Sequence, residues 1–176
     1  MAKKGDFDTM WKMFPDHVAY PTLDSLFTFI GGGLERNIHE PGFGPNGNTC
    51  AARISRCLNY GGMELSYAKL KELDLNPLRG DDKKFYLFRV REIKTYLANV
   101  LGKPSAVATK DFFGAFADKR GIVAYDVANW SDATGHVALW NGKEFRETHD
   151  DYRGLQDDPT TSVKEAQTTK MTLWAW

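Results

Sequence analysis

The sequence predicts an α+β fold in which helices pack on one face of an antiparallel sheet. Two helical segments come first: one begins at Cys50, directly after a glycine-rich loop, and the other spans residues 86–101. Segments predicted to be strands follow at 121–127, which is apolar and β-branched, and at 136–147, and turn residues join them. Helices and strands that are grouped separately along the chain in this way are typical of the α+β class.

The composition is that of one globular domain. The 176 residues can bury a sizeable core, and 42% hydrophobic with 26% charged residues is ordinary for a folded protein. We expect a single domain over residues 1–176, because the chain contains no repeat and no low-complexity stretch. The 23 basic and 23 acidic residues balance. This balance argues against nucleic acid as the main partner, because binding phosphates needs a basic surface.

The sequence indicates a protein made in the cytoplasm and not inserted in a membrane. No stretch approaches the ~20 apolar residues of a membrane span. The basic first residues are not followed by the apolar core of a Sec signal. Cys50 and Cys57 are two helical turns apart, about 10 Å along the axis, which is too far for a disulfide between them. Both thiols are therefore expected to be free.

The first part of the chain alternates apolar segments and breakers. Residues 6–14 have apolar side chains at helical spacing, and Pro15 ends the predicted helix. A second apolar segment, residues 23–30, stops at three consecutive glycines. The polar segment 63–84 contains a proline and a glycine, and we expect it to be an irregular excursion or lid. Apolar residues then recur at helical spacing over 86–101.

Cys50 is a candidate nucleophile because of its position. The loop 39–48 holds two prolines and three glycines, and Thr49 then offers a hydroxyl that can cap a helix. A thiol in the first turn meets unpaired N–H groups and the positive end of the helix dipole, and both favour the thiolate. The alternative is that Cys50 is a small buried hydrophobic residue. In this helix the apolar face contains Cys50, Ile54, Cys57 and Leu58, and Arg53 and Arg56 lie roughly opposite.

The β segments predict a hairpin. Residues 121–127 form one strand, and His136 begins the next after a turn at 131–135. Asn141-Gly142 is a strong two-residue hairpin signal, so residues 143–147 should return as a strand. Residues 171–176 could add a further strand at the edge of the sheet.

His136 is the candidate base that would take the thiol proton. With a two-residue loop, Trp140 lies opposite Lys143, and counting back places His136 opposite Glu147. Opposed residues share a face with Cβ atoms about 5 Å apart. Glu147 could then accept the imidazole Nδ1–H and leave Nε2 toward the sulfur.

The third residue has alternatives, because the prediction of Glu147 depends on the register of the hairpin. A one-residue bulge would spoil that register, and Asp150 or Asp151 could then serve. Glu147 could also be a solvated strand residue.

The remaining sequence signals do not indicate a metal or a cofactor. His17 and His39 are expected at the surface, and His149 lies beyond the hairpin without recognisable zinc-ligand spacing. The glycine runs match neither a P-loop nor a dinucleotide fingerprint.

Two blocks of sequence resemble a known family. They are the segments 48–55 around Cys50, and 121–127 continued by 130–142 around His136. Both are similar to the type VI secretion amidase effectors of the Tae4 family, and the resemblance extends over about residues 7–150. Members of that family are papain-like cysteine peptidases related to the NlpC/P60 group. The resemblance therefore implies a papain-like NlpC/P60-type fold.

The resemblance also implies an activity and partners. Such effectors are injected by the type VI apparatus into rival Gram-negative bacteria. There they cut the γ-D-glutamyl–meso-diaminopimelate amide bond of peptidoglycan in the periplasm, and a dedicated immunity protein protects the producer. A housekeeping NlpC/P60-type endopeptidase and an inactive peptidoglycan-binding module are the alternatives; the former should carry a signal peptide or wall-binding repeats.

The family motifs assign roles to residues of this chain. Cys50 matches the nucleophile and His136 the base. The family's third residue is an aspartate, and counting from the histidine puts Glu147 at that place, without the cysteines that flank it in some members. Asn48 and Asp132 lie near the two catalytic candidates in sequence, so they are candidate substrate-binding residues; turn formation is the alternative role for each.

Overall fold

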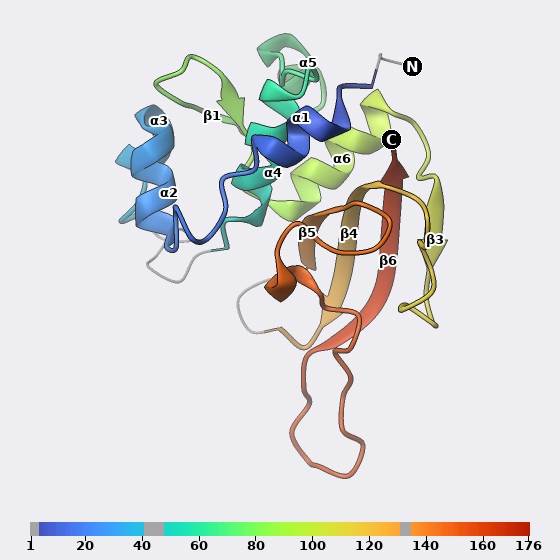
Figure 1. The fold of residues 1–176 in the computed structure, drawn as a ribbon. Coiled ribbons are helices and arrows are strands. Elements are labelled where there is room, and N and C mark those ends of the chain that lie inside the picture. Colours follow the sequence, from blue (N-terminus) through green and yellow to red (C-terminus); the bar gives the residue numbers. More distant parts are fainter. Residues whose placement is uncertain (1–3, 41–47, 131–134) are drawn as a thin grey trace. The chain divides into compact units, whose positions relative to one another are not determined.

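The computed structural model describes residues 4–40, 48–130 and 135–176. The chain divides into two compact units, which we call the helical unit (residues 2–96) and the sheet unit (residues 97–176). Helices predominate in the first, and an antiparallel sheet forms the second (Figure 1). The predicted α+β class is confirmed.

The helical unit contains most of the helices and one small hairpin. Its elements are α1 (Phe7–Lys12), α2 (Leu23–Ile30), α3 (Gly32–Arg36), α4 (Cys50–Tyr60), α5 (Tyr67–Glu72), β1 (Leu78–Arg79) and β2 (Phe85–Tyr86), followed by α6 (Val90–Val100), whose last residues belong to the sheet unit.

The first two helices begin where the predicted helical segments do. The Asp6 carboxylate accepts the Thr9 N–H at 2.7 Å and caps α1. Thr22 and Ser25 form a reciprocal capping box at the start of α2. Apolar residues of α2 and α3 share one core with α4 and β2, which includes Leu26, Phe27, Leu34, Ala52 and Tyr86. The predicted helices at 6–14 and 23–30 are confirmed.

Two glycines follow the last residue of helix α4 and end it. Gly62 has a positive φ of 90°. The Met63 N–H bonds the Leu58 carbonyl at 2.9 Å, and the Gly61 N–H bonds that of Cys57 at 2.8 Å. This is a Schellman termination, in which glycine adopts the left-handed conformation at low cost.

The prediction of an irregular excursion over 63–84 is wrong. Helix α5 lies there, capped by the Ser66 side chain, and β1 pairs with β2 as an antiparallel hairpin. The Asp82 carboxylate orders the hairpin, because it accepts hydrogen bonds from the hydroxyls of Tyr60 (2.9 Å) and Tyr86 (2.6 Å). Since Tyr86 belongs to β2, α6 begins at Val90, later than its apolar spacing predicts.

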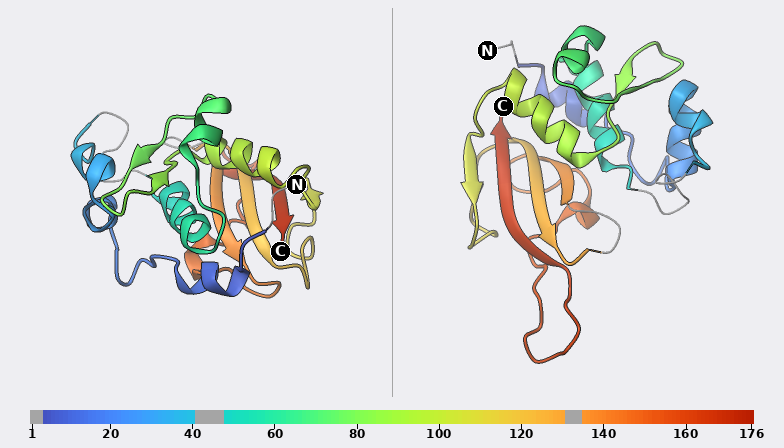
Figure 2. Two further views of the ribbon diagram at one scale, coloured as in Figure 1. Left: turned by 90° about the horizontal axis from the view of Figure 1, so that it is seen from above. Right: turned by 180° about the vertical axis from the view of Figure 1, so that it is seen from behind.

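The sheet unit is built on four antiparallel strands in the order β3-β6-β4-β5 (Figure 2). Its elements are β3 (Ala106–Ala108), β4 (Gly121–Ala128), β5 (Gly135–Trp140), the 3-10 turn η1 (Thr148–Asp150) and β6 (Gln167–Ala175). The strands predicted at 121–127 and from residue 136 are confirmed.

The C-terminal strand does not lie at an edge of the sheet, so this prediction is wrong. Strand β6 lies inside the sheet, because it pairs with β4 along eight residue pairs and with β3 on its other side. Gly121 is opposite Ala175, and a side chain at Gly121 would collide with the Trp174 carbonyl. The edge strand β3 has three residues, too few for a period-2 pattern to be recognised.

The predicted hairpin register is also wrong. Trp140 pairs with Phe145 instead of Lys143, and the Arg146 N–H bonds the Leu139 carbonyl at 2.9 Å. The loop therefore has four residues, 141–144, and the register differs by two. The cause is Asn141, whose side-chain oxygen accepts the N–H groups of Lys143 and Glu144, both at 2.9 Å. No regular strand follows over 143–147; the chain continues into η1.

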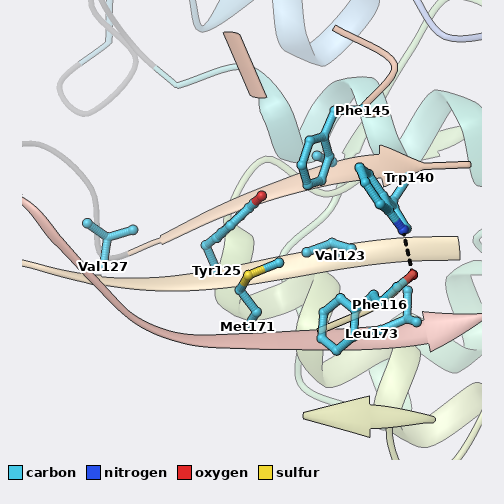
Figure 3. Close-up of a cluster of buried hydrophobic side chains, with 9 residues drawn as sticks. Phe116, Val123, Tyr125, Val127, Trp140, Phe145, Met171 and Leu173 are labelled. Atoms are coloured by element: carbon cyan, nitrogen blue, oxygen red, sulfur yellow. Dashed lines mark hydrogen bonds between the residues drawn. The ribbon is translucent and has the colours of Figure 1, made fainter. Parts of the chain in front are cut away.

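One face of the sheet carries a cluster of buried apolar side chains (Figure 3). The Trp140 indole N–H donates to the Phe116 carbonyl at 2.9 Å, so this large side chain is buried with its polar atom paired. The cluster consists of Phe116, Val123, Tyr125, Val127, Ala138, Trp140, Phe145, Met171 and Leu173.

None of the helices within the described part of the chain has the length and apolarity needed to cross a membrane.

Leu173→Ala is expected to lower the free energy of unfolding by about 2–5 kcal/mol, because Leu173 is fully buried and the substitution leaves a cavity. Val107→Ala, on the neighbouring strand β3, is the control; that side chain is 55% exposed, and its loss should cost less than about 0.5 kcal/mol. Urea denaturation measures both. Equal losses in the two variants would contradict this assignment of the core.

Candidate active site

Cys50 is the first residue of α4, as predicted, and is buried. Cys57, two turns later, is fully buried, and both cysteines are free thiols. The first intrahelical bond of α4 runs from the Arg53 N–H to the Thr49 carbonyl at 3.0 Å. The amides of residues 50–52 therefore precede the regular bonding of the helix, where backbone N–H groups favour negative charge.

The predicted cap by the Thr49 hydroxyl is wrong. Thr49 is the N-cap residue, but its side chain makes no capping bond, and its backbone has helical angles instead of the extended ones that capping needs. Its hydroxyl oxygen accepts from Arg53 Nε at 2.9 Å. The side chain that binds the helix start is that of Asn48, whose oxygen accepts the Cys50 N–H at 3.0 Å.

Arg53 was expected opposite the apolar face of the helix, but it is buried, with only 1% of its surface exposed. Its guanidinium donates to the carbonyl oxygens of Pro15 and Tyr20, the latter at 2.7 Å, in addition to Thr49. Burial of a cation is costly unless its N–H groups are bonded. These bonds connect the segment before α2 to the start of α4 and so fix the residues next to Cys50.

His136 is the second residue of β5, and every residue of that strand is buried. Tyr125 of β4 lies directly opposite. Burial raises the pKa of Tyr125, and the nearby charge of Asp151 raises it further, so this phenol stays neutral. The His136 ring lies 6.3 Å from the ring of Tyr125, which belongs to the buried apolar cluster of the sheet.

The carboxylate that contacts His136 is Asp150. Its Oδ1 lies 2.8 Å from His136 Nε2, and the two residues are 2% and 6% exposed. A carboxylate only accepts hydrogen bonds, so in the neutral imidazole Nε2 carries the proton and Nδ1 is the nitrogen able to take another. These roles of Nδ1 and Nε2 are the reverse of those that the sequence predicts.

Glu147 contacts a different histidine, His149. Its Oε2 lies 3.0 Å from Nε2 of His149, and its assignment to His136 depended on the register that the structure contradicts. The chain turns into η1 after Glu147, where the Asp150 N–H bonds the Glu147 carbonyl at 3.1 Å. This turn brings Asp150, one of the two alternatives, to the imidazole.

Arg153 anchors the segment that carries Asp150. It forms a two-point ion pair with Asp151, at 2.7 and 2.6 Å. Its guanidinium also lies over the rings of Phe113, Trp140 and Phe145, at 5.0–5.4 Å from their centroids. Cation–π contacts of this kind hold the segment against the hairpin. No periodic pattern in the sequence indicates this anchor.

The predicted site residues belong to both units of the chain. His136 and Asp150 come together in the sheet unit, whereas Cys50 and Asn48 belong to the helical unit. Asp132 and most of the glycine-rich loop lie outside the described residues. His39 is exposed, as expected, and His17 is half-buried.

Comparison with protein-family models identifies the family of this chain. Residues 46–176 match the model described as "Tae4: Type VI secretion system (T6SS), amidase effector protein 4". The chain belongs to the Tae4 family. The matched region contains Cys50, His136 and Asp150, and Tae4 proteins are amidase effectors of the type VI secretion system.

Solved Tae4 structures have the same fold over nearly their whole length. The Tae4 effector from Salmonella typhimurium, in complex with the immunity protein Tai4 from Enterobacter cloacae, is 28% identical with a TM-score of 0.78. The Tae4–Tai4 complex from Enterobacter cloacae is 30% identical with a TM-score of 0.77. Each alignment covers 98% of this chain and 99% of that chain. Comparison with curated protein sequences gives no match.

The ion pair of Asp151 makes stability depend on pH. The hydrogen-bonded guanidinium of Arg153 holds the pKa of Asp151 below its usual value, against the opposing effect of partial burial. A lowered pKa in the folded state stabilises the protein above the unfolded pKa of about 3.9, and this contribution disappears as pH falls through the folded value.

Asp151→Asn should therefore lower the free energy of unfolding at pH 7 and change it progressively less as the pH falls below about 4. Urea denaturation between pH 3 and 7 measures the difference from wild type. Asp111→Asn, an exposed residue of the same unit, should stay within about 0.5 kcal/mol of wild type throughout. A constant difference for Asp151→Asn would contradict the ion pair.

Proposed function

We propose that this Tae4 protein is a cysteine amidase that hydrolyses the γ-D-glutamyl–meso-diaminopimelate bond of Gram-negative peptidoglycan. The observation that carries the proposal is the buried His136–Asp150 pair, within a chain that belongs to an amidase family. A histidine oriented by a carboxylate is the base that a thiol nucleophile requires.

Cys50 is the proposed nucleophile. His136 Nδ1 accepts the thiol proton, and the thiolate attacks the γ-glutamyl carbonyl carbon to form a tetrahedral intermediate. As the C–N bond breaks, the imidazolium returns the proton to the diaminopimelate amine. Water, deprotonated by the same imidazole, then releases the glutamyl product from the thioester and restores the thiol.

Asp150 is the proposed third residue, in place of Glu147. Its bond to Nε2 fixes the tautomer in which Nδ1 is the acceptor, and its charge stabilises the imidazolium that forms. Because both side chains are buried, water screens this interaction little.

The oxyanion would be stabilised by amides in the first turn of α4. The Cys50 N–H is bonded to Asn48 in this structure, so it can contribute only after Asn48 releases it, whereas the amides of Ala51 and Ala52 precede the regular helix bonds. Asn48 and Asp132 are also the proposed contacts for the substrate.

The family supports a biological setting. We propose delivery by the type VI apparatus and action in the periplasm of the target cell. Tai4 immunity proteins bind the solved Tae4 effectors, and a cognate immunity protein would bind this chain in the producing cell. Proposed partners are thus the peptidoglycan stem peptide, the immunity protein and the secretion apparatus.

Wild-type protein should release stem peptides that begin at diaminopimelate from Gram-negative sacculi, and Cys50→Ala should release none. Mass spectrometry of the soluble fragments identifies the bond. Cys57→Ala is the matched control on the same helix and should keep the activity. Identical fragment profiles from wild type and folded Cys50→Ala would refute the hydrolase and favour a peptidoglycan-binding module.

Asp150→Asn should lower kcat about 10²–10⁴-fold, because the amide neither fixes the tautomer nor stabilises the imidazolium. Glu147→Gln is the matched control, three residues away, and should keep kcat within about tenfold of wild type. Steady-state hydrolysis of a purified stem peptide measures both. A greater loss in Glu147→Gln than in Asp150→Asn would restore Glu147 as the third residue.

A further inference from the structure

We propose that Tyr152 is a positioning residue that fixes the orientation of the His136 imidazole. This inference rests on the proposed function, in which His136 transfers the proton. The two ring centroids lie 4.7 Å apart, and their planes are inclined at 68°, which is the favoured edge-to-face arrangement of aromatic pairs.

A hydrogen bond at one nitrogen does not by itself fix the plane of the imidazole. A bond from Nε2 to Asp150 fixes one point of the ring, but the χ2 torsion of histidine is broad, and the ring plane can still tilt about that point. Tilting would displace Nδ1 on the other side of the ring. A neighbouring ring in edge-to-face contact opposes this tilt, because the two planes must keep their mutual angle to remain packed.

Tyr152 can act in this way because other rings restrain it. Trp130 lies 5.1 Å from it at 80°, and Tyr125 lies 5.8 Å from it at 84°. Tyr125 is also the residue opposite His136 in the sheet, 6.3 Å away between centroids. The rings of Tyr125, Trp130 and Tyr152 thus form an aromatic frame that adjoins the imidazole.

The backbone of Tyr152 is restrained too. Its carbonyl accepts the hydroxyl of Thr168 at 2.6 Å and the N–H of Leu155 at 3.3 Å. Thr168 is buried in β6, inside the sheet. Since Tyr152 is two residues after Asp150, one anchored segment supplies both the hydrogen bond to Nε2 and the packing of the ring.

The test compares Tyr152→Ala and Tyr152→Phe in the full chain. Tyr152→Ala should lower kcat about 10- to 100-fold with KM nearly unchanged, because a base displaced by a fraction of an ångström transfers protons poorly. Tyr152→Phe keeps the ring and should stay within about threefold of wild type. Leu173→Ala, a destabilised but folded control, should keep wild-type kcat.

A second readout follows the imidazole itself. In ¹⁵N-labelled protein the His136 Nε2–H signal should be sharp in wild type and Tyr152→Phe, and broadened or lost in Tyr152→Ala. Should Tyr152→Ala fail to fold, Tyr152→Leu removes the ring while filling more of its volume and is expected to behave in the same way.

Either of two results would overturn the proposal: a wild-type kcat with a sharp Nε2–H signal in the ring-less variant, or equal losses in Tyr152→Phe and Tyr152→Ala. The NMR readout needs no turnover. If wild type itself cleaves no peptidoglycan, the proposed function fails, and the signal of His136 in the same variants still decides whether Tyr152 orients the ring.

Discussion

The side chain of Asn141 determines where the chain goes after β5. By accepting the amides of Lys143 and Glu144, it closes a four-residue loop and lets Phe145 pair with Trp140. The returning chain makes this one pairing and then turns into η1, which ends at Asp150. The contact between Asp150 and His136 thus depends on the hydrogen bonds that the Asn141 side chain makes within its own loop, nine residues earlier in the chain.

The helical unit depends on a different constraint, the buried cation of Arg53. Its bonds to Pro15, Tyr20 and Thr49 join parts of the chain that are up to 38 residues apart. A buried charge of this kind must keep all its partners, since losing one leaves an unpaired group in a medium of low dielectric. Thr49, the residue directly before Cys50, is therefore held by an interaction that tolerates little movement.

Much of the fold could be predicted because it depends on local patterns. Helical spacing located α1, α2 and α4, a β-branched run located β4, and the turn residues on either side located β5. Cys50 and His136 could be singled out from their positions at the start of a helix and of a strand. The carboxylate that contacts His136 could not be predicted, because a type I′ turn at Asn141-Gly142 and the observed Asx-stabilised loop share the same two residues and differ by two in register.

The other wrong or missing predictions concern residues whose contacts leave no periodic pattern in the sequence. Arg53 looked solvent-facing because its partners are backbone carbonyls far away in sequence. Strand β6 looked like an edge because β3, which covers its other side, is only three residues long. Tyr152 and Arg153 lie in a polar tail without any regular spacing, and their roles follow only from rings and carboxylates that the fold brings to them.

The short outer strand has a consequence for how copies of the protein behave together. With a formal net charge of zero, the molecule has little long-range repulsion to keep its copies apart. Its longest strands, β4 and β6, have their backbone groups committed inside the sheet, and the 145–146 segment occupies part of the free side of β5. At the opposite edge of the sheet, only the three residues of β3 are available to pair with a strand of another molecule. Resistance to edge-to-edge aggregation is thus supplied by topology, where charge cannot supply it.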